Sequence, residues 1–168
     1  MLETSEDLQW LQRLMDDSLQ RSGEHLRSII DPGRRTPSAA TVVRLLSGMK
    51  VLVVATVSAD GQPRTSAVDG HFLRGRWVFT TSADAVKCRD LQRRPAVSTS
   101  YVDEEKFALF THGDAEFLAP GHVDFDWVEA HLTAHYGASP STFGPSIAYI
   151  RINPRWSVAY AFDVAALD

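Results

Sequence analysis

The 168-residue chain has one cysteine, Cys88, and only three lysines among its basic residues. A single cysteine cannot form an intramolecular disulfide or a zinc ribbon, and it fits a reducing compartment, so we expect a cytoplasmic protein. The longest apolar run, Val51–Ala55, is far too short to cross a membrane, and the acidic N-terminal residues argue against a signal peptide. The formal net charge of -4 excludes a general nucleic-acid surface.

The front of the chain has the apolar spacing of helices. Apolar side chains recur at helical intervals over residues 5–30, which predicts one long amphipathic helix that ends at Asp31-Pro32-Gly33. Ser38 is a typical N-cap for a second, short helix that runs to Leu46. An apolar stripe of this length must be covered, and we expect the long helix to pack at or near an interface between two subunits.

The remainder of the chain has the pattern of strands joined by hairpins. Residues 51–57 form an apolar run typical of a buried strand, and Asp60-Gly61 is a strong hairpin signal. Further strands are predicted at 64–72, 76–81, 96–102, 107–118, 147–152 and 156–162, with helices at 84–92 and 123–136. The sequence therefore predicts a mostly β, antiparallel barrel with flanking helices, divided into an N-terminal helical extension (1–33) and a barrel domain (38–162).

The segment Thr80–Leu91 is the strongest candidate for a binding site. Thr80, Thr81 and Ser82 supply three consecutive hydroxyls after a strand, and Lys87 follows on the predicted helix. Hydroxyls and backbone N–H groups at a helix start, with a cation nearby, can hold a phosphate. The alternative is a simple strand-to-helix junction in which Ser82 or Asp84 caps the helix and Lys87 is solvated.

Four segments together resemble the pyridoxamine 5′-phosphate oxidase-like family of FMN-binding split barrels, which includes deazaflavin-dependent reductases that use coenzyme F420. The resemblance covers roughly residues 38–162, and its most specific part is the segment Thr80–Val97. The segments are Leu52–Arg64, Thr80–Val97, His112–Ala115 and Arg151–Pro154. The resemblance implies a homodimer with two cofactor sites at the subunit interface.

The resemblance also implies which residues hold the cofactor. Its phosphate would be surrounded by Arg64, Ser66, Thr80, Thr81, Ser82 and Lys87, and its ring would run beside Ala67, Val68 and Asp69. Arg64 and Ser66 share one face of their strand, and we expect that face to look toward the third strand. The arginine and histidine pair with which true pyridoxamine phosphate oxidases hold their substrate is not found, so oxidation of vitamin B6 is not expected.

Other candidate groups are more ordinary. His131 and His135 have a metal-compatible spacing, but residue 132 is leucine and no third ligand is indicated, so we expect no metal. Lys87 beside Cys88 could lower the pKa of a reactive thiol, although a packed cysteine is the commoner case. Asp69 and His71 share a strand face, where either could contact a flavin ring or a substrate, or simply form a solvated pair.

These observations lead to one main hypothesis and two alternatives. The main hypothesis is a redox enzyme that binds coenzyme F420 or FMN and exchanges a hydride or electron pair with a small organic substrate. F420 is weakly favoured, and its acidic tail would draw on Arg34, Arg35, Arg74 and Arg76. The first alternative is a non-catalytic flavin-, deazaflavin- or haem-binding module for storage, sensing or stress response. The second is an interaction protein with an empty site.

Overall fold

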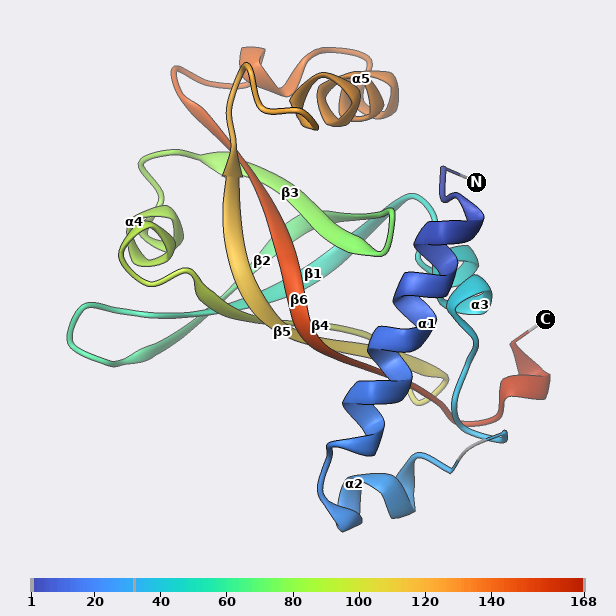
Figure 1. Cartoon of the computed structure of the whole chain (residues 1–168). Helices are drawn as coiled ribbons and strands as arrows, with labels where there is room; N and C mark the ends of the chain where they lie inside the picture. The colour runs from blue at the N-terminus through green and yellow to red at the C-terminus, as the bar shows by residue number, and fades with distance from the viewer. Residues whose placement is uncertain (1, 32, 168) are drawn as a thin grey trace.

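The computed structural model describes residues 2–31 and 33–167 and is built around a closed barrel of six antiparallel strands (Figure 1). The strand order around the barrel is β1-β2-β3-β6-β5-β4. The strands are β1 (Met49–Val57), β2 (Pro63–Leu73), β3 (Arg76–Ser82), β4 (Ala96–Asp103), β5 (Phe107–Leu118) and β6 (Ile147–Ala161). The helices are α1 (Ser5–Gln20), α2 (Glu24–Ile29), α3 (Ala39–Leu45), α4 (Val86–Arg93) and α5 (Phe125–Tyr136), with short 3-10 turns η1 (Pro140–Thr142) and η2 (Val164–Ala166). The predicted mostly β fold with flanking helices is confirmed.

The long N-terminal helix of the prediction is in fact two helices. Thr4 caps α1 through a capping box with Asp7, but the helix ends at Gln20. The side chain of Ser22 bonds back to the Ser18 carbonyl, and Gly23 adopts an extended backbone before α2 starts. Serine favours such breaks because its hydroxyl can bond to nearby backbone groups outside the helix, and glycine favours them because it loses the most backbone entropy on entering a helix. Pro32, within the predicted helix end, lies outside the described residues.

Helix α1 packs on its own barrel, and not at the β1 face that is most exposed. Leu11 and Met15 of α1 are buried in the same core cluster as Leu52 and Ile150 of the barrel. The helix runs along β6, which stands opposite β1 in the strand order (Figure 1). The barrel itself thus covers the apolar stripe of the helix, and the expectation that the helix lies near a subunit interface stays a prediction. Ser38 caps α3 as predicted.

The first strand differs from the fully buried strand that its apolar run predicts. Leu52, Val54 and Thr56 point into the barrel and are buried, whereas Val51 and Val53 on the other face are 61% and 40% exposed. Side chains alternate between the two faces of a strand, so an unbroken apolar run in a barrel must place half of its members outside. Packing inside the barrel therefore does not explain why Val51 and Val53 are apolar.

The last two predicted strands form one continuous strand. We predicted a turn at Asn153-Pro154-Arg155, but β6 runs unbroken from Ile147 to Ala161 beside β5. A register shift between His112 and Gly113 absorbs one extra residue of β6 as a β-bulge. Proline is tolerated in a strand at such a bulge, so Pro154 did not mark a turn.

Candidate functional site

A groove between strand β2 and helix α4 brings three of the predicted phosphate-binding residues together. Arg64 and Ser66 come from β2, Thr56 lies beside Arg64 on β1, and Lys87 comes from the first turn of α4. The groove has a volume of about 140 Å³ and is lined by Thr56, Arg64, Thr65, Ser66, Val86, Lys87 and Asp90. We call it the cationic groove. Its two cations and the Ser66 hydroxyl are donors of the kind that a phosphate group requires.

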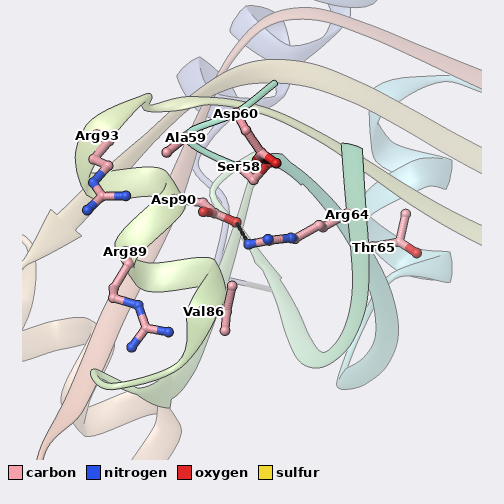
Figure 2. Close-up of a pocket in the computed structure, with 9 residues that line it drawn as sticks. All are labelled: Ser58, Ala59, Asp60, Arg64, Thr65, Val86, Arg89, Asp90 and Arg93. Carbon is pink, nitrogen blue, oxygen red and sulfur yellow. Dashed lines mark hydrogen bonds and ion pairs between the residues drawn. The ribbon is translucent and has the colours of Figure 1, made fainter. Parts of the chain in front are cut away.

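A wider open groove of about 700 Å³ continues from the cationic groove toward the turn between β1 and β2 (Figure 2). Arg89 and Arg93 of α4 line one wall, and Ser58 and Asp60 of the turn line the other. Arg94 ties the two walls together, since its guanidinium donates to the Ser58 and Ala59 carbonyls at 2.6 and 3.2 Å.

Asp90 is the buried centre of the cationic groove. Asp90 as a whole is only 4% exposed, and its Oδ2 accepts a hydrogen bond of 3.2 Å from the Thr56 hydroxyl. The same oxygen lies 3.4 Å from Nη1 of Arg64, whose side chain is about half exposed (Figure 2). The guanidinium of Arg64 is thus held by a carboxylate on the helix that also carries Lys87. Lys87 itself makes no ion pair within the described part of the chain.

The structure separates the three hydroxyls of β3 from this groove. Arg64 and Ser66 face α4, and not the third strand as predicted, because β2 pairs with β3 only over Gly70–Leu73. The segment Thr80–Ser82 instead pairs with β6 and does not contribute to the lining of the cationic groove. Neither predicted residue caps α4: the N-cap is Ala85, while the Ser82 hydroxyl accepts from the Asp84 N–H at 3.3 Å.

The residues expected beside the cofactor ring lie on two different faces of β2. Ala67 and Asp69 are exposed on the outside of the barrel, opposite Val53 and Val51 of β1. Val68 points inward and is buried in the core, so only its backbone could face a ligand. The outer face of β2 therefore continues directly into the exposed apolar face of β1.

Arg89, Asp90 and Arg93 were missed by the sequence reasoning, although a signal for them exists. Together with Val86 they recur at the i, i+3, i+4 and i+7 positions of α4, which places them on one helix face. Three of the four arginines proposed instead for an acidic tail have other partners, and Arg34 lines neither groove. Arg74 and Arg76 stack on Trp127 and Trp10, at 4.2 and 4.4 Å from the ring centroids, and Arg35 lies over Tyr160 and Phe162.

His71 is not beside a ligand but beneath helix α5. It is 1% exposed, its Nε2 lies 3.0 Å from the Tyr136 hydroxyl, and its ring meets those of His131 and His135 at centroid distances of 5.4 and 4.7 Å. This burial contradicts both interpretations for His71, since its side chain can neither contact a ligand nor form a solvated pair with Asp69. Within residues 2–31 and 33–167 no cluster of His, Cys, Asp or Glu has a metal-binding arrangement.

Burial of His71 predicts a loss of stability in acid. Desolvation, together with the neighbouring His135 and His131, lowers the pKa of His71 to about 4 from an ordinary 6.5. The unfolded chain then binds a proton that the folded chain excludes, so stability falls as the pH drops from about 6.5 to 4, by up to about 3 kcal/mol. Urea unfolding at a series of pH values should show this loss, and His71→Gln should reduce it. An unchanged slope in that variant contradicts the assignment.

Cys88 is a packed side chain. It is fully buried on α4, its Sγ donates to the Ser82 carbonyl at 3.4 Å, and burial raises the pKa of the thiol. A raised pKa disfavours the nucleophilic thiolate. The hypothesis of a reactive cysteine is therefore not supported.

Comparison with known proteins places this barrel in a family. A profile of the pyridoxamine 5′-phosphate oxidase family matches residues 39–158. The chain belongs to this family. The match begins at α3, so α1 and α2 lie outside it, and no protein of the curated collections matches the chain significantly.

Solved structures share the fold of this family member at low sequence identity. A conserved hypothetical protein from Mycobacterium tuberculosis has a TM-score of 0.65 at 20% identity, over 78% of this chain and 89% of its own. A structure named F420 reductase gives 0.54 at 23% identity, over 68% and 93%. The haem storage protein of Vibrio cholerae gives 0.59 at 18% identity, over 72% and 92%. Identities this low establish the split-barrel fold alone. Among the described helices none is long and apolar enough to cross a bilayer.

Proposed function

We propose that this protein is a split-barrel oxidoreductase that binds coenzyme F420 or FMN, with the cofactor phosphate in the cationic groove. The observation that carries the proposal is the convergence of Arg64, Ser66 and Lys87 from two separate elements onto one groove. A convergent set of cations and hydroxyls is the expected recognition site for a phosphate ester. The groove also adjoins the outer face of β2, where a planar ring would have room beside Ala67 and Asp69.

The chain's own residues would bind the cofactor and orient its ring. Arg64 and Lys87 would neutralise the phosphate, and the Ser66 hydroxyl would donate to one of its oxygens. The backbone of β2 would present hydrogen bonds to the edge of the ring and fix which of its faces meets the substrate. The bound cofactor would supply the hydride or electron-pair transfer. No protein nucleophile is required, which agrees with the inert Cys88.

A second copy of the chain completes the proposed site. The outer face of β1, β4 and β5 exposes a group of large apolar side chains, namely Met49, Val51, Val53, Val57, Val102 and Phe110. This apolar face includes a groove of about 490 Å³ between β1 and β4. We infer that a second subunit covers the apolar face, since contiguous apolar patches on soluble proteins mark interaction sites. The cofactor ring would then lie at the edge of that interface, beside β2.

The choice between F420 and FMN is supported by charge beyond the phosphate. Coenzyme F420 ends in an acidic glutamyl tail, and the wide groove next to the cationic groove carries Arg89 and Arg93. One structure of similar fold is named an F420 reductase, which agrees with this choice. We therefore favour F420, with FMN as the alternative cofactor and a small organic molecule as substrate.

A fluorescence titration of the apo-protein with F420 and with FMN, side by side, tests the proposal. We expect tight binding of F420, and Lys87→Ala should weaken binding by about 1–3 kcal/mol, the contribution of a charged hydrogen bond. Lys106→Ala is a matched control, because Lys106 lies on the β4–β5 turn and pairs with Glu104. Binding of neither cofactor, or equal affinities in both variants, would overturn the phosphate assignment. Turnover with an added reductant and acceptor would then separate an enzyme from a storage or sensing module.

A further inference from the structure

The cationic groove contains a feature that a simple phosphate site does not need. Asp90 places a carboxylate among the residues that would bind an anion, and this carboxylate is 95% buried. Its position is fixed, since Oδ2 accepts from the Thr56 hydroxyl at 3.2 Å and pairs with Arg64 at 3.4 Å. A buried negative charge beside an anion site repels the ligand more strongly than an exposed one, because water screens it poorly.

The charges of the groove sum to a single positive charge. Arg64 and Lys87 contribute two positive charges, and Asp90 contributes one negative charge, among the lining residues. A phosphodiester carries one negative charge and is balanced by this set. A phosphomonoester carries close to two at neutral pH, which would leave an uncompensated negative charge in the groove. Uncompensated charge in a partly desolvated site is unfavourable.

We propose that Asp90 is a specificity-determining residue that makes the cationic groove select singly charged phosphodiesters over dianionic phosphomonoesters. The inference rests on the proposed function, because it concerns the same groove, and it names the class of phosphate that the groove takes. Arg64 is central to this selection: its guanidinium already pairs with Asp90 at 3.4 Å, so the groove holds too little uncompensated positive charge for a dianion.

The other charged groups near Asp90 contribute less to the charge balance at the phosphate itself. Arg89, Arg93 and Asp60 line the neighbouring wide groove and are exposed, so water and salt screen them. No histidine is found among the lining residues of either groove. Titration of the ligand itself should therefore dominate the pH dependence of binding between pH 5.5 and 7.5.

The test exploits the second pKa of a phosphomonoester, which lies near 6. FMN changes from mostly monoanion to dianion between pH 5.5 and 7.5, whereas the phosphodiester of F420 stays singly charged. With the wild-type protein, FMN should bind about tenfold more weakly at pH 7.5 than at pH 5.5, and F420 should change by less than about twofold. These two series need no variant, so they remain decisive if a substitution at Asp90 impairs folding.

Asp90→Asn supplies the matched variant. Asparagine keeps an acceptor oxygen for Thr56 and Arg64 but removes the charge, so FMN affinity at pH 7.5 should rise about tenfold and its pH dependence should fall below about threefold. Asp126→Asn, which removes an exposed carboxylate of α5 that lines neither groove, should leave both quantities unchanged. FMN binding that is independent of pH in the wild-type protein, or an equal effect of the two variants, overturns the inference. Failure of both FMN and F420 to bind at any pH overturns the proposed function instead.

Discussion

Gly113→Ala is expected to destabilise the protein by about 3 kcal/mol or more, because the added methyl group has no space. A Cβ built at Gly113 would lie 2.1 Å from the Asn153 carbonyl oxygen and 2.9 Å from the Cα atom of Pro154. Both atoms belong to the backbone of β6, which cannot rotate away as a side chain could. The substitution therefore forces apart the longest strand pair of the barrel at its bulge.

Thermal unfolding measures this effect. In a domain of this size about 3 kcal/mol corresponds to a fall in Tm of about 6–12 °C. Gly23→Ala is the control, since no atom lies within 4 Å of a Cβ built there and its φ of -62° suits any residue. If the Gly113→Ala variant unfolds within about 1–2 °C of the wild-type protein, the bulge is not tightly packed.

Val51→Asp is expected to convert a dimer into monomers. Val51 is the most exposed large residue of the apolar face, at 61%, so a carboxylate there stays solvated in a single barrel, and water screens its repulsion of Asp69 opposite it on β2. In a dimer the same carboxylate would be buried without a partner, which costs several kcal/mol per subunit. Sedimentation analysis should give twice the chain mass of 18.6 kDa for the wild-type protein and the chain mass itself for the variant.

The control for Val51→Asp is Val123→Asp. Val123 is 87% exposed and precedes α5, away from the apolar face, so this change should leave the dimer intact. A wild-type protein that sediments as a monomer would contradict the inferred second subunit. Loss of cofactor affinity in Val51→Asp alone would further place the cofactor at the interface.

Sequence patterns predicted local structure well where a local signal decides the outcome. Ser38 was recognised as a cap because its hydroxyl acts on a backbone N–H three residues away. The hairpin at Asp60-Gly61 followed for the same reason, with Gly61 at a φ of +85° that favours glycine. The turn predicted at Pro154 was wrong, because proline usually ends a strand, whereas here a bulge formed with the distant Gly113 accommodates it inside β6.

The candidate site likewise combines residues that the sequence predicted with one that only the structure revealed. The resemblance implied Arg64, Ser66 and Lys87, and the structure does bring them to one groove. It also implied Thr80, Thr81 and Ser82, which the sequence pattern had already grouped with Lys87, but their strand pairs with β6 and they do not line the groove. Asp90 was not identified: its place on one face of α4 with Arg89 and Arg93 can be read from the sequence, but its burial against Thr56 of a strand 34 positions earlier cannot.

The sequence by itself therefore determined most of the elements, the barrel class and the family, because alternation, helical spacing, caps and turn residues act over a few positions; the break between α1 and α2 and the continuity of β6 were not among them. The tertiary structure alone decided which charges meet, which apolar face stays open and which histidine is buried. Those outcomes depend on strand register and on how helices pack against the barrel, and both are set by contacts between residues far apart in the chain. The balance of Arg64, Lys87 and Asp90 belongs to this second group.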